Sequence, residues 1–121
     1  MRKRDYRDYL SDILESIDDI DSFINDVSFN DFVNDKKTLK AVIRSIEVMG
    51  EAAKRIPESV KAKYPSVPWK KMAGMRDKMI HEYHNIDLEI LWKTIKEDIP
   101  SVKPLIHKAL ENHVENKDQF I

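Results

Sequence analysis

Apolar side chains recur every three or four positions along almost the whole chain, and this spacing constrains the fold more than any other feature. It is clearest near the start, where the stripe consists of Tyr6, Leu10, Ile13, Leu14, Ile17, Ile20, Ile24 and Val27. A helix with one apolar stripe has to bury that stripe against another helix. The chain also has only 2 Gly and 5 Pro, which leaves few residues for the turns of a sheet. The sequence therefore predicts an all-α protein.

Capping residues and prolines indicate where the helices of the first half begin and end. One long helix is expected over residues 6–27, followed by a break and a short helical turn that buries Phe29 and Phe32. Asp35 is a good N-cap for a second long helix, because its carboxylate can accept hydrogen bonds from the first free backbone N–H groups. Pro57 should end that helix, since it cannot donate a backbone hydrogen bond.

The second half is expected to add further helices. Pro68 suits the first position of a helix that ends near Asn85, because its fixed φ angle is already helical. Asp87 should cap the next helix, and Pro100 should break or kink it before a last helix begins. Together these segments predict an antiparallel bundle of four or five principal helices.

Length and composition limit the domain organisation and the chemistry. A chain of 121 residues is expected to form a single domain over residues 1–121, with a polar tail from about residue 111. The absence of cysteine excludes disulfides and thiol chemistry and is typical of a reducing compartment. No apolar run reaches the roughly 18 residues of a membrane span, and no apolar segment follows the charged amino terminus. We therefore expect no membrane span, no signal peptide and a cytoplasmic location.

Charge is distributed unevenly along the chain. Residues 36–81 carry 12 basic and 4 acidic side chains, whereas residues 1–35 carry 4 basic and 10 acidic ones. A basic segment that ends on Arg76 and His81 suggests a surface that attracts anions. The opposite charges could equally pair with one another within the fold and leave ordinary solvated helix faces. The sequence leaves both interpretations open.

The stretch from Arg76 to Tyr83 places a guanidinium, an imidazole and a phenol within eight residues. Arginine is always charged and can hold a phosphate, and histidine can move a proton near neutral pH. These groups are sufficient in principle to cut a phosphodiester without a metal or another cofactor. On an ideal helix, however, Arg76 and His81 point about 140° apart. Two copies related by a two-fold axis could bring them together, which is a weak argument for a homodimer.

Two glutamates on the preceding long helix are further candidates. Glu47 and Glu51 lie four residues apart, with Gly50 between them. Paired carboxylates can bind metals in helical bundles, but no Glu-x-x-His pattern on other helices accompanies them. We therefore expect no metal site. Gly50 is expected to let two helices approach closely, while the glutamates pair with basic groups near the Arg76 motif.

Two extended phrases resemble a known family. The Arg-x4-His-x-Tyr pattern of Arg76, His81 and Tyr83, together with the longer phrase 67–83, is similar to the HepT-like branch of the HEPN ribonucleases. The phrase 46–57 resembles the second signature of that branch, at a matching distance along the chain. Because both phrases occur in order, the resemblance is more specific than an isolated Arg-x4-His pattern.

The resemblance implies an all-helical homodimeric toxin that cleaves RNA without a metal, and an antitoxin of the minimal nucleotidyltransferase type. The antitoxin would silence the toxin by attaching AMP to the motif tyrosine. By position, Arg76 and His81 would be catalytic and Tyr83 would be modified. Tyr83 could otherwise simply pack at the edge of the bundle. Many relatives have asparagine after the arginine, whereas this chain has Asp77, whose charge could orient His81 or repel phosphate.

The chemistry of these groups predicts a particular product. His81 would transfer the proton of the RNA 2′-hydroxyl, and Arg76 would stabilise the charge on the non-bridging phosphate oxygens. Cleavage would then leave a 2′,3′-cyclic phosphate. Two alternatives use the same residues differently: a non-catalytic helical partner of a nucleotidyltransferase, with the basic segment as its docking surface, and a purely structural dimerising bundle.

Overall fold

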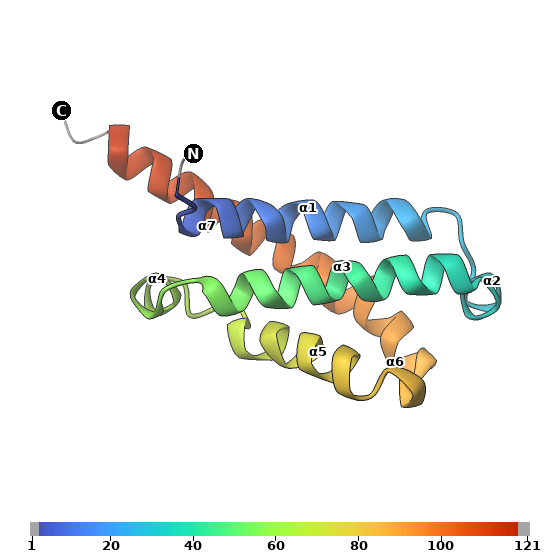
Figure 1. The fold of residues 1–121 in the computed structure, drawn as a ribbon. Coiled ribbons are helices and arrows are strands. Elements are labelled where there is room, and N and C mark those ends of the chain that lie inside the picture. The colour runs from blue at the N-terminus through green and yellow to red at the C-terminus, as the bar shows by residue number, and fades with distance from the viewer. Residues whose placement is uncertain (1–2, 119–121) are drawn as a thin grey trace.

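The computed structural model describes the backbone of residues 3–118 and the side chains of residues 3–112. Helices make up nearly all of this region, and the prediction of an all-α fold is confirmed (Figure 1). In chain order the elements are α1 (Tyr6–Ile24), α2 (Phe29–Asn34), α3 (Lys36–Arg55), α4 (Glu58–Lys63), α5 (Trp69–His81), the 3₁₀ turn η1 (Tyr83–Asn85), α6 (Leu88–Lys93), the π-helical segment η2 (Thr94–Asp98) and α7 (Ile99–Asp118).

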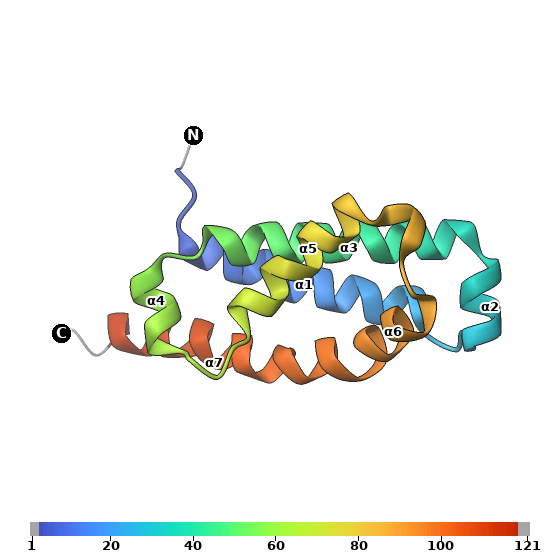
Figure 2. The same cartoon turned by 90° about the horizontal axis from the view of Figure 1, so that it is seen from below.

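The bundle is organised around α3. This helix packs along α1 on one side and against α5 on the other, and α7 packs against α1 (Figures 1 and 2). The helices α1 and α3 run antiparallel, with α2 at one end of the pair and α4 at the other. The fully buried side chains include Leu10, Ile13, Ile17, Ile20, Phe32, Val42, Ile46, Met49, Met72, Ile95, Ile99 and Ile106. Leu10, Ile13, Ile17 and Ile20 belong to the apolar stripe from which the first helix was predicted.

Local capping explains where the two longest antiparallel helices start. Asp5 and Asp8 form a reciprocal capping box at the start of α1. The Asp35 carboxylate accepts hydrogen bonds from the backbone N–H groups of Lys37 and Thr38, as the sequence predicted. The first helix ends at Ile24 instead of continuing to residue 27. Asp26 takes the left-handed conformation with φ of 59°, which turns the chain toward α2.

The short helix α2 contributes less buried surface than expected. Phe32 is fully buried, whereas Phe29 is only half-buried. Both rings contact Trp92 of α6, with centroid distances of 5.9 Å for Phe29 and 5.0 Å for Phe32. Phe29 therefore packs against Trp92 at a tilt and stays partly exposed, so its predicted burial is only partial.

Prolines act at helix boundaries in three different ways. Pro57 follows the end of α3, as predicted. Pro68 precedes the first helical residue of α5 and accepts the Met72 N–H through its carbonyl, so it is the N-cap and not the first helical position. Pro100 does not break the chain into separate helices, because α6, η2 and α7 follow one another without a gap. The N–H of Ile99 instead reaches the carbonyl of Thr94 in the wider π pattern, just before the proline that lacks an N–H.

The helix that carries the Arg76 motif is shorter than expected. It ends at His81, and Glu82 leaves the helical conformation with φ of -121° and ψ of 26°. Tyr83 therefore lies on the separate turn η1, not on the same α-helix as Arg76. Asp87 caps α6 as predicted, accepting hydrogen bonds from two backbone N–H groups. Within residues 3–118, none of the helices is long and apolar enough to cross a membrane.

Candidate active site at the crossing of α3 and α5

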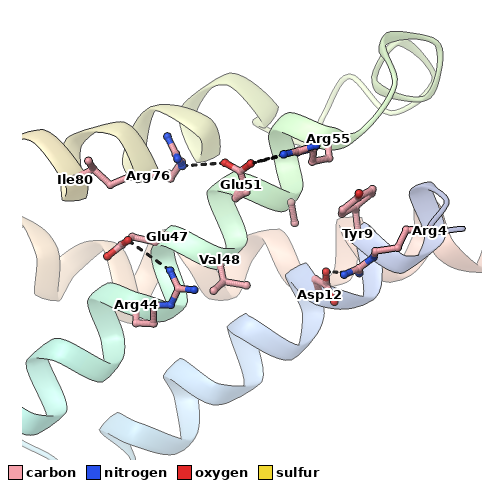
Figure 3. A pocket seen from close by; sticks show the side chains of 11 residues that line it. Arg4, Tyr9, Asp12, Arg44, Glu47, Val48, Glu51, Arg55, Arg76 and Ile80 are labelled. Carbon is pink, nitrogen blue, oxygen red and sulfur yellow. Dashed lines mark hydrogen bonds and ion pairs between the residues drawn. The ribbon is translucent and has the colours of Figure 1, made fainter. Parts of the chain in front are cut away.

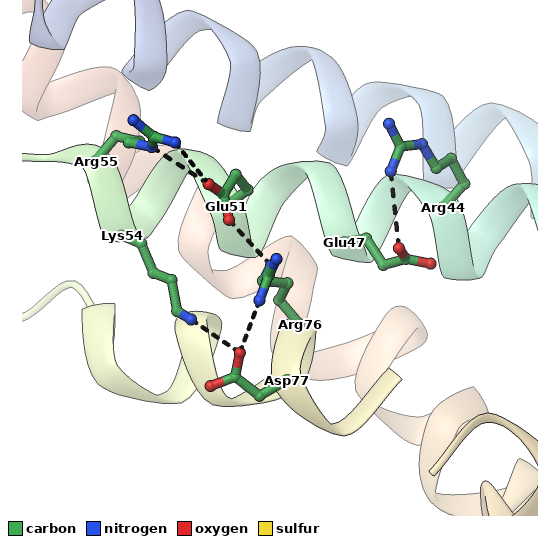
Figure 4. Close-up of polar contacts among 7 residues, drawn as sticks. All are labelled: Arg44, Glu47, Glu51, Lys54, Arg55, Arg76 and Asp77. Carbon is green, nitrogen blue, oxygen red and sulfur yellow. Dashed lines mark hydrogen bonds and ion pairs between the residues drawn. The ribbon is translucent and has the colours of Figure 1, made fainter. Parts of the chain in front are cut away.

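The helices α3 and α5 approach most closely at Gly50. A Cβ atom built on Gly50 would lie 2.8 Å from the backbone oxygen of Met72 on α5, which is closer than real Cβ atoms come to such atoms. Glycine is therefore required for this crossing, as the sequence suggested. The crossing also places the side chain of Arg76 directly against the last two turns of α3 (Figure 4).

Arg76 is held by two carboxylates from different helices. Its Nε atom lies 3.0 Å from Oε2 of Glu51 on α3, and its Nη1 atom lies 3.0 Å from Oδ1 of Asp77 on α5. The side chain of Arg76 is 28% exposed, so the pair is shielded from water on one side and open on the other. Nη1 donates a hydrogen bond to Asp77, and the carboxylate of Glu51 pairs with the other side of the guanidinium, so the two contacts restrain its position.

Each of these carboxylates has a second basic partner. Lys54 lies 2.9 Å from Oδ1 of Asp77, and Arg55 lies 3.2 Å from Oε1 of Glu51 (Figure 4). The result is an alternating row of charges, Lys54–Asp77–Arg76–Glu51–Arg55, which we call the ion row. The hydrogen bond from Lys54, followed by that from Arg76, lowers the pKa of the Asp77 carboxyl below its ordinary value of 3.8. Asp77 therefore stays ionised, and its charge is compensated by neighbouring cations.

The two glutamates predicted from the sequence separate into different roles. Glu51 pairs with Arg76 and Arg55, as expected of a group near the motif. Glu47 instead lies 3.7 Å from Arg44, one turn earlier on the same helix. Among the described residues, no group of three histidine or acidic side chains is close enough to hold a metal ion.

A polar cleft of about 410 Å³ opens beside the ion row, between α1, α3 and α5 (Figure 3). It is lined by Arg4, Tyr9, Asp12, Arg44, Glu47, Val48, Glu51, Ala52, Arg55, Arg76 and Ile80. From α5 the cleft receives Arg76 and Ile80, which lie on the same helix face because they are four residues apart. His81 is not among the described residues that line the cleft.

His81 and Tyr83 lie at the far end of α5, and both are exposed. His81 is the last residue of that helix, and Tyr83 follows on η1 with 39% of its surface exposed. The phenol ring of Tyr83 meets the His84 ring edge to face, with centroids 5.2 Å apart. This arrangement agrees with the helix geometry expected from the sequence, in which Arg76 and His81 do not share a face.

Comparison with known proteins now adds an independent observation. The sequence profile of the family described as "Ribonuclease HepT-like" matches residues 13–109, which span most of the bundle and the whole ion row. The chain belongs to the HepT-like ribonuclease family. Its membership confirms the resemblance that the two sequence phrases suggested.

Individual relatives of the HepT-like family are similar over nearly their full lengths. A Thermococcus cleftensis protein named "Probable ribonuclease HepT" is 52% identical over 88% of this chain and 96% of its own. A Methanocaldococcus jannaschii protein named "Putative RNase MJ0127" is 48% identical over 98% of both chains. A "Putative RNase" of Caldanaerobacter subterraneus is 40% identical over 87% of this chain and 94% of its own. No solved structure shows significant similarity to the chain.

Several residues at this site were not predicted from the sequence. Arg44 and Arg55 each lie three or four residues from a glutamate on α3, which is the usual spacing of an ion pair on one helix. The sequence therefore contained a signal for both of these ion pairs. The ion pair between Lys54 and Asp77 joins residues that are 23 positions apart, so no local sequence pattern predicts it.

The arrangement can bind an anion and can place a proton-transfer group one turn further along the same helix. Arg76 offers a fixed cation at the wall of an open cleft. His81 offers an exposed imidazole that is free to reach a partner outside its own helix face. These are the two functions that cleavage of a phosphodiester requires when the substrate supplies its own nucleophile.

Proposed function

We propose that the chain is a metal-independent RNA endonuclease in which Arg76 and His81 are the catalytic residues. Membership of the HepT-like ribonuclease family supports RNA as the substrate. The observation that carries the proposal for Arg76 is its fixed guanidinium at the wall of an open polar cleft. A cation held in this way needs no reorganisation as negative charge develops on a phosphate.

The proposed reaction uses the 2′-hydroxyl of the RNA as nucleophile. His81 removes the proton of this hydroxyl, and the oxygen then forms a bond to the adjacent phosphorus. Arg76 stabilises the non-bridging oxygens while the bond from phosphorus to the 5′-oxygen breaks. The leaving oxygen takes a proton from the second His81 of a dimer. The products are a 2′,3′-cyclic phosphate and a 5′-hydroxyl, so atoms and protons balance without a metal. A positioned acid or base contributes about 10²- to 10⁴-fold to such a rate.

A homodimer is part of the proposal because one chain directs its two catalytic groups differently. Arg76 and Ile80 line the cleft, whereas His81 is not among the described residues that line it. Ile80 is 43% exposed, which leaves an apolar side chain beside the proposed site. A second copy related by a two-fold axis would cover Ile80 and join the two clefts, so that both copies of His81 lie beside one shared site.

Silencing by AMP transfer fits the chemistry of Tyr83. In the proposed reaction the phenol oxygen attacks the α-phosphorus of ATP, pyrophosphate leaves, and the phenol proton passes to solvent. The ring is 39% exposed and follows α5 by only two residues, so a nucleotidyltransferase could reach it. The attached phosphate would bring a negative charge next to the proposed RNA site. The chain would then be the toxin of a type VII-like toxin–antitoxin pair that acts in the cytoplasm.

The decisive experiment incubates the purified chain with RNA in the presence of EDTA and identifies the new ends. We expect 2′,3′-cyclic phosphates, and we expect Arg76→Ala and His81→Ala to lose cleavage while circular dichroism stays unchanged. His107→Ala is the matched control, because His107 is another exposed helical histidine. Products with 3′-hydroxyl ends would contradict the mechanism. Full cleavage by both variants would favour the alternative of a non-catalytic helical partner of a nucleotidyltransferase.

A further inference from the structure

The guanidinium of Arg76 is bound along two of its edges and open at a third position. Oε2 of Glu51 lies 3.0 Å from Nε in an ion pair, and Oδ1 of Asp77 accepts a hydrogen bond from Nη1. Within the described part of the chain, no group accepts a hydrogen bond from Nη2, and no buried side-chain nitrogen or oxygen lacks a partner. Nη2 is therefore accessible to solvent. Its N–H groups are available to a phosphate oxygen.

The two carboxylates that hold Arg76 differ in how firmly they are placed. Asp77 is the next residue on α5 and reaches α3 only through the long, flexible side chain of Lys54, so it restrains Arg76 indirectly. Glu51 belongs to α3, the central helix, and its second oxygen is held by Arg55 at 3.2 Å. Gly50, the neighbour of Glu51, brings α3 against α5 at this level. Among the described residues, Glu51 makes the direct contact that ties the guanidinium to a different helix.

We propose that Glu51 is a positioning residue for Arg76: it binds Nε and thereby directs Nη2 toward the scissile phosphate. This inference rests on the proposed catalytic role of Arg76. A negative charge beside an RNA site would by itself weaken phosphate binding, so its presence requires a compensating function. Holding the guanidinium in one plane provides that function, because a displacement of about 1 Å at a catalytic group can cost about 10²-fold in rate.

The chain supplies a matched control for this idea. Glu47 lines the same cleft one helical turn away, but its described partner is Arg44 and not Arg76. Removing either glutamate deletes one negative charge from the cleft. If the two carboxylates act only through their charge, Glu47→Ala and Glu51→Ala should both lower KM for RNA and leave kcat unchanged. A positioning role predicts different behaviour for Glu51 alone.

For Glu51→Ala we expect kcat to fall by about 10- to 100-fold, with KM unchanged or lower and with the same thermal midpoint of unfolding as the wild-type protein. Glu51→Gln keeps an oxygen that can lie against Nε and should recover most of the lost kcat. Glu47→Ala should keep the wild-type kcat. A wild-type kcat for Glu51→Ala would overturn the inference, and so would an equal loss in Glu47→Ala.

A measurement that does not depend on activity separates this inference from the proposed function. The Nε–H proton of Arg76, assigned by its disappearance in Arg76→Lys, should give a slowly exchanging signal in nuclear magnetic resonance spectra. The signal should persist in Glu47→Ala and Glu51→Gln and be lost in Glu51→Ala. If the signal behaves in this way but Arg76→Ala still cleaves RNA, the catalytic assignment fails and the positioning role fails with it. If Arg76→Ala is inactive and the signal survives in Glu51→Ala, only the positioning role is wrong.

Discussion

The Cβ atom of Arg76 occupies the space in which Gly50 would need a side chain. A Cβ atom built on Gly50 would lie 2.3 Å from the Cβ of Arg76 and 3.3 Å from its Cα. These atoms belong to the backbone or are rigidly attached to it, so they cannot move away without shifting α5. The proposed catalytic arginine thus rests directly on the one position of α3 that has no side chain.

Gly50→Ala should therefore destabilise the protein and disturb the site. A helix interior favours alanine by about 1 kcal/mol, but overpacking against α5 costs about 1–3 kcal/mol. We expect the free energy of unfolding, measured with urea, to fall by about 1 kcal/mol, and RNA cleavage to fall further than this loss explains. Gly74→Ala is the control, because nothing lies within 4 Å of a Cβ built there. That variant should gain about 0.5–1 kcal/mol. A stabilised Gly50→Ala protein would contradict the close approach.

Ile80→Glu should separate the proposed dimer. Ile80 is 43% exposed and lines the cleft beside Arg76, so a second copy that completes the site has to cover it. We expect light scattering to detect monomers of the variant, RNA cleavage to be lost and the helical circular dichroism to be kept. Ile90→Glu replaces a similar residue that is 59% exposed on α6, away from this cleft, and should remain dimeric and active. Cleavage by monomeric Ile80→Glu would remove the case for a shared site.

Tyr83→Phe should separate cleavage from silencing. The ring is kept while the phenol oxygen, the proposed acceptor of AMP, is removed. We expect the variant to cleave RNA at a rate within a few-fold of wild type and to escape silencing when it is expressed with a nucleotidyltransferase that silences the wild-type protein. Mass spectrometry should detect the adenylate on wild-type protein and on the control Tyr64→Phe, but not on Tyr83→Phe. An adenylate on Tyr83→Phe would show that another side chain is the acceptor.

Asp77→Asn should change how the free energy of unfolding depends on pH. The pKa of Asp77 is lowered by the hydrogen bond from Lys54 and then by that from Arg76. A carboxyl with a lowered pKa in the folded state stabilises the protein above the unfolded-state value of about 3.9, and this contribution disappears as the pH falls through the folded-state pKa. Urea unfolding should thus find Asp77→Asn less stable than wild type near pH 7, with the difference shrinking below about pH 3.9. Asp98→Asn, at an exposed aspartate of η2, is the control for the removal of one negative charge.

The sequence was sufficient to predict most of the helices. The apolar period, the caps Asp35 and Asp87 and the stop at Pro57 all depend on contacts within a few residues, so local physical rules apply to them. The helix boundaries that were predicted wrongly lie where the backbone geometry is irregular. The early end of α1 at Ile24 depends on a left-handed residue, and the passage around Pro100 depends on a π-helical segment. Neither conformation has a strong signature in the order of side chains.

The chain by itself determined which chemistry is available, since an arginine, a histidine and a tyrosine at fixed spacing can be recognised without a fold. It also determined that Arg76 and His81 face different ways, because their angular separation follows from the helix period alone. Only the tertiary structure decided which groups surround Arg76. Glu51 and Lys54 lie more than 20 residues earlier in the chain, and they reach Arg76 and Asp77 because α3 and α5 cross at a glycine. The strength of an ion pair depends on distance in space, and the order of residues does not specify that distance.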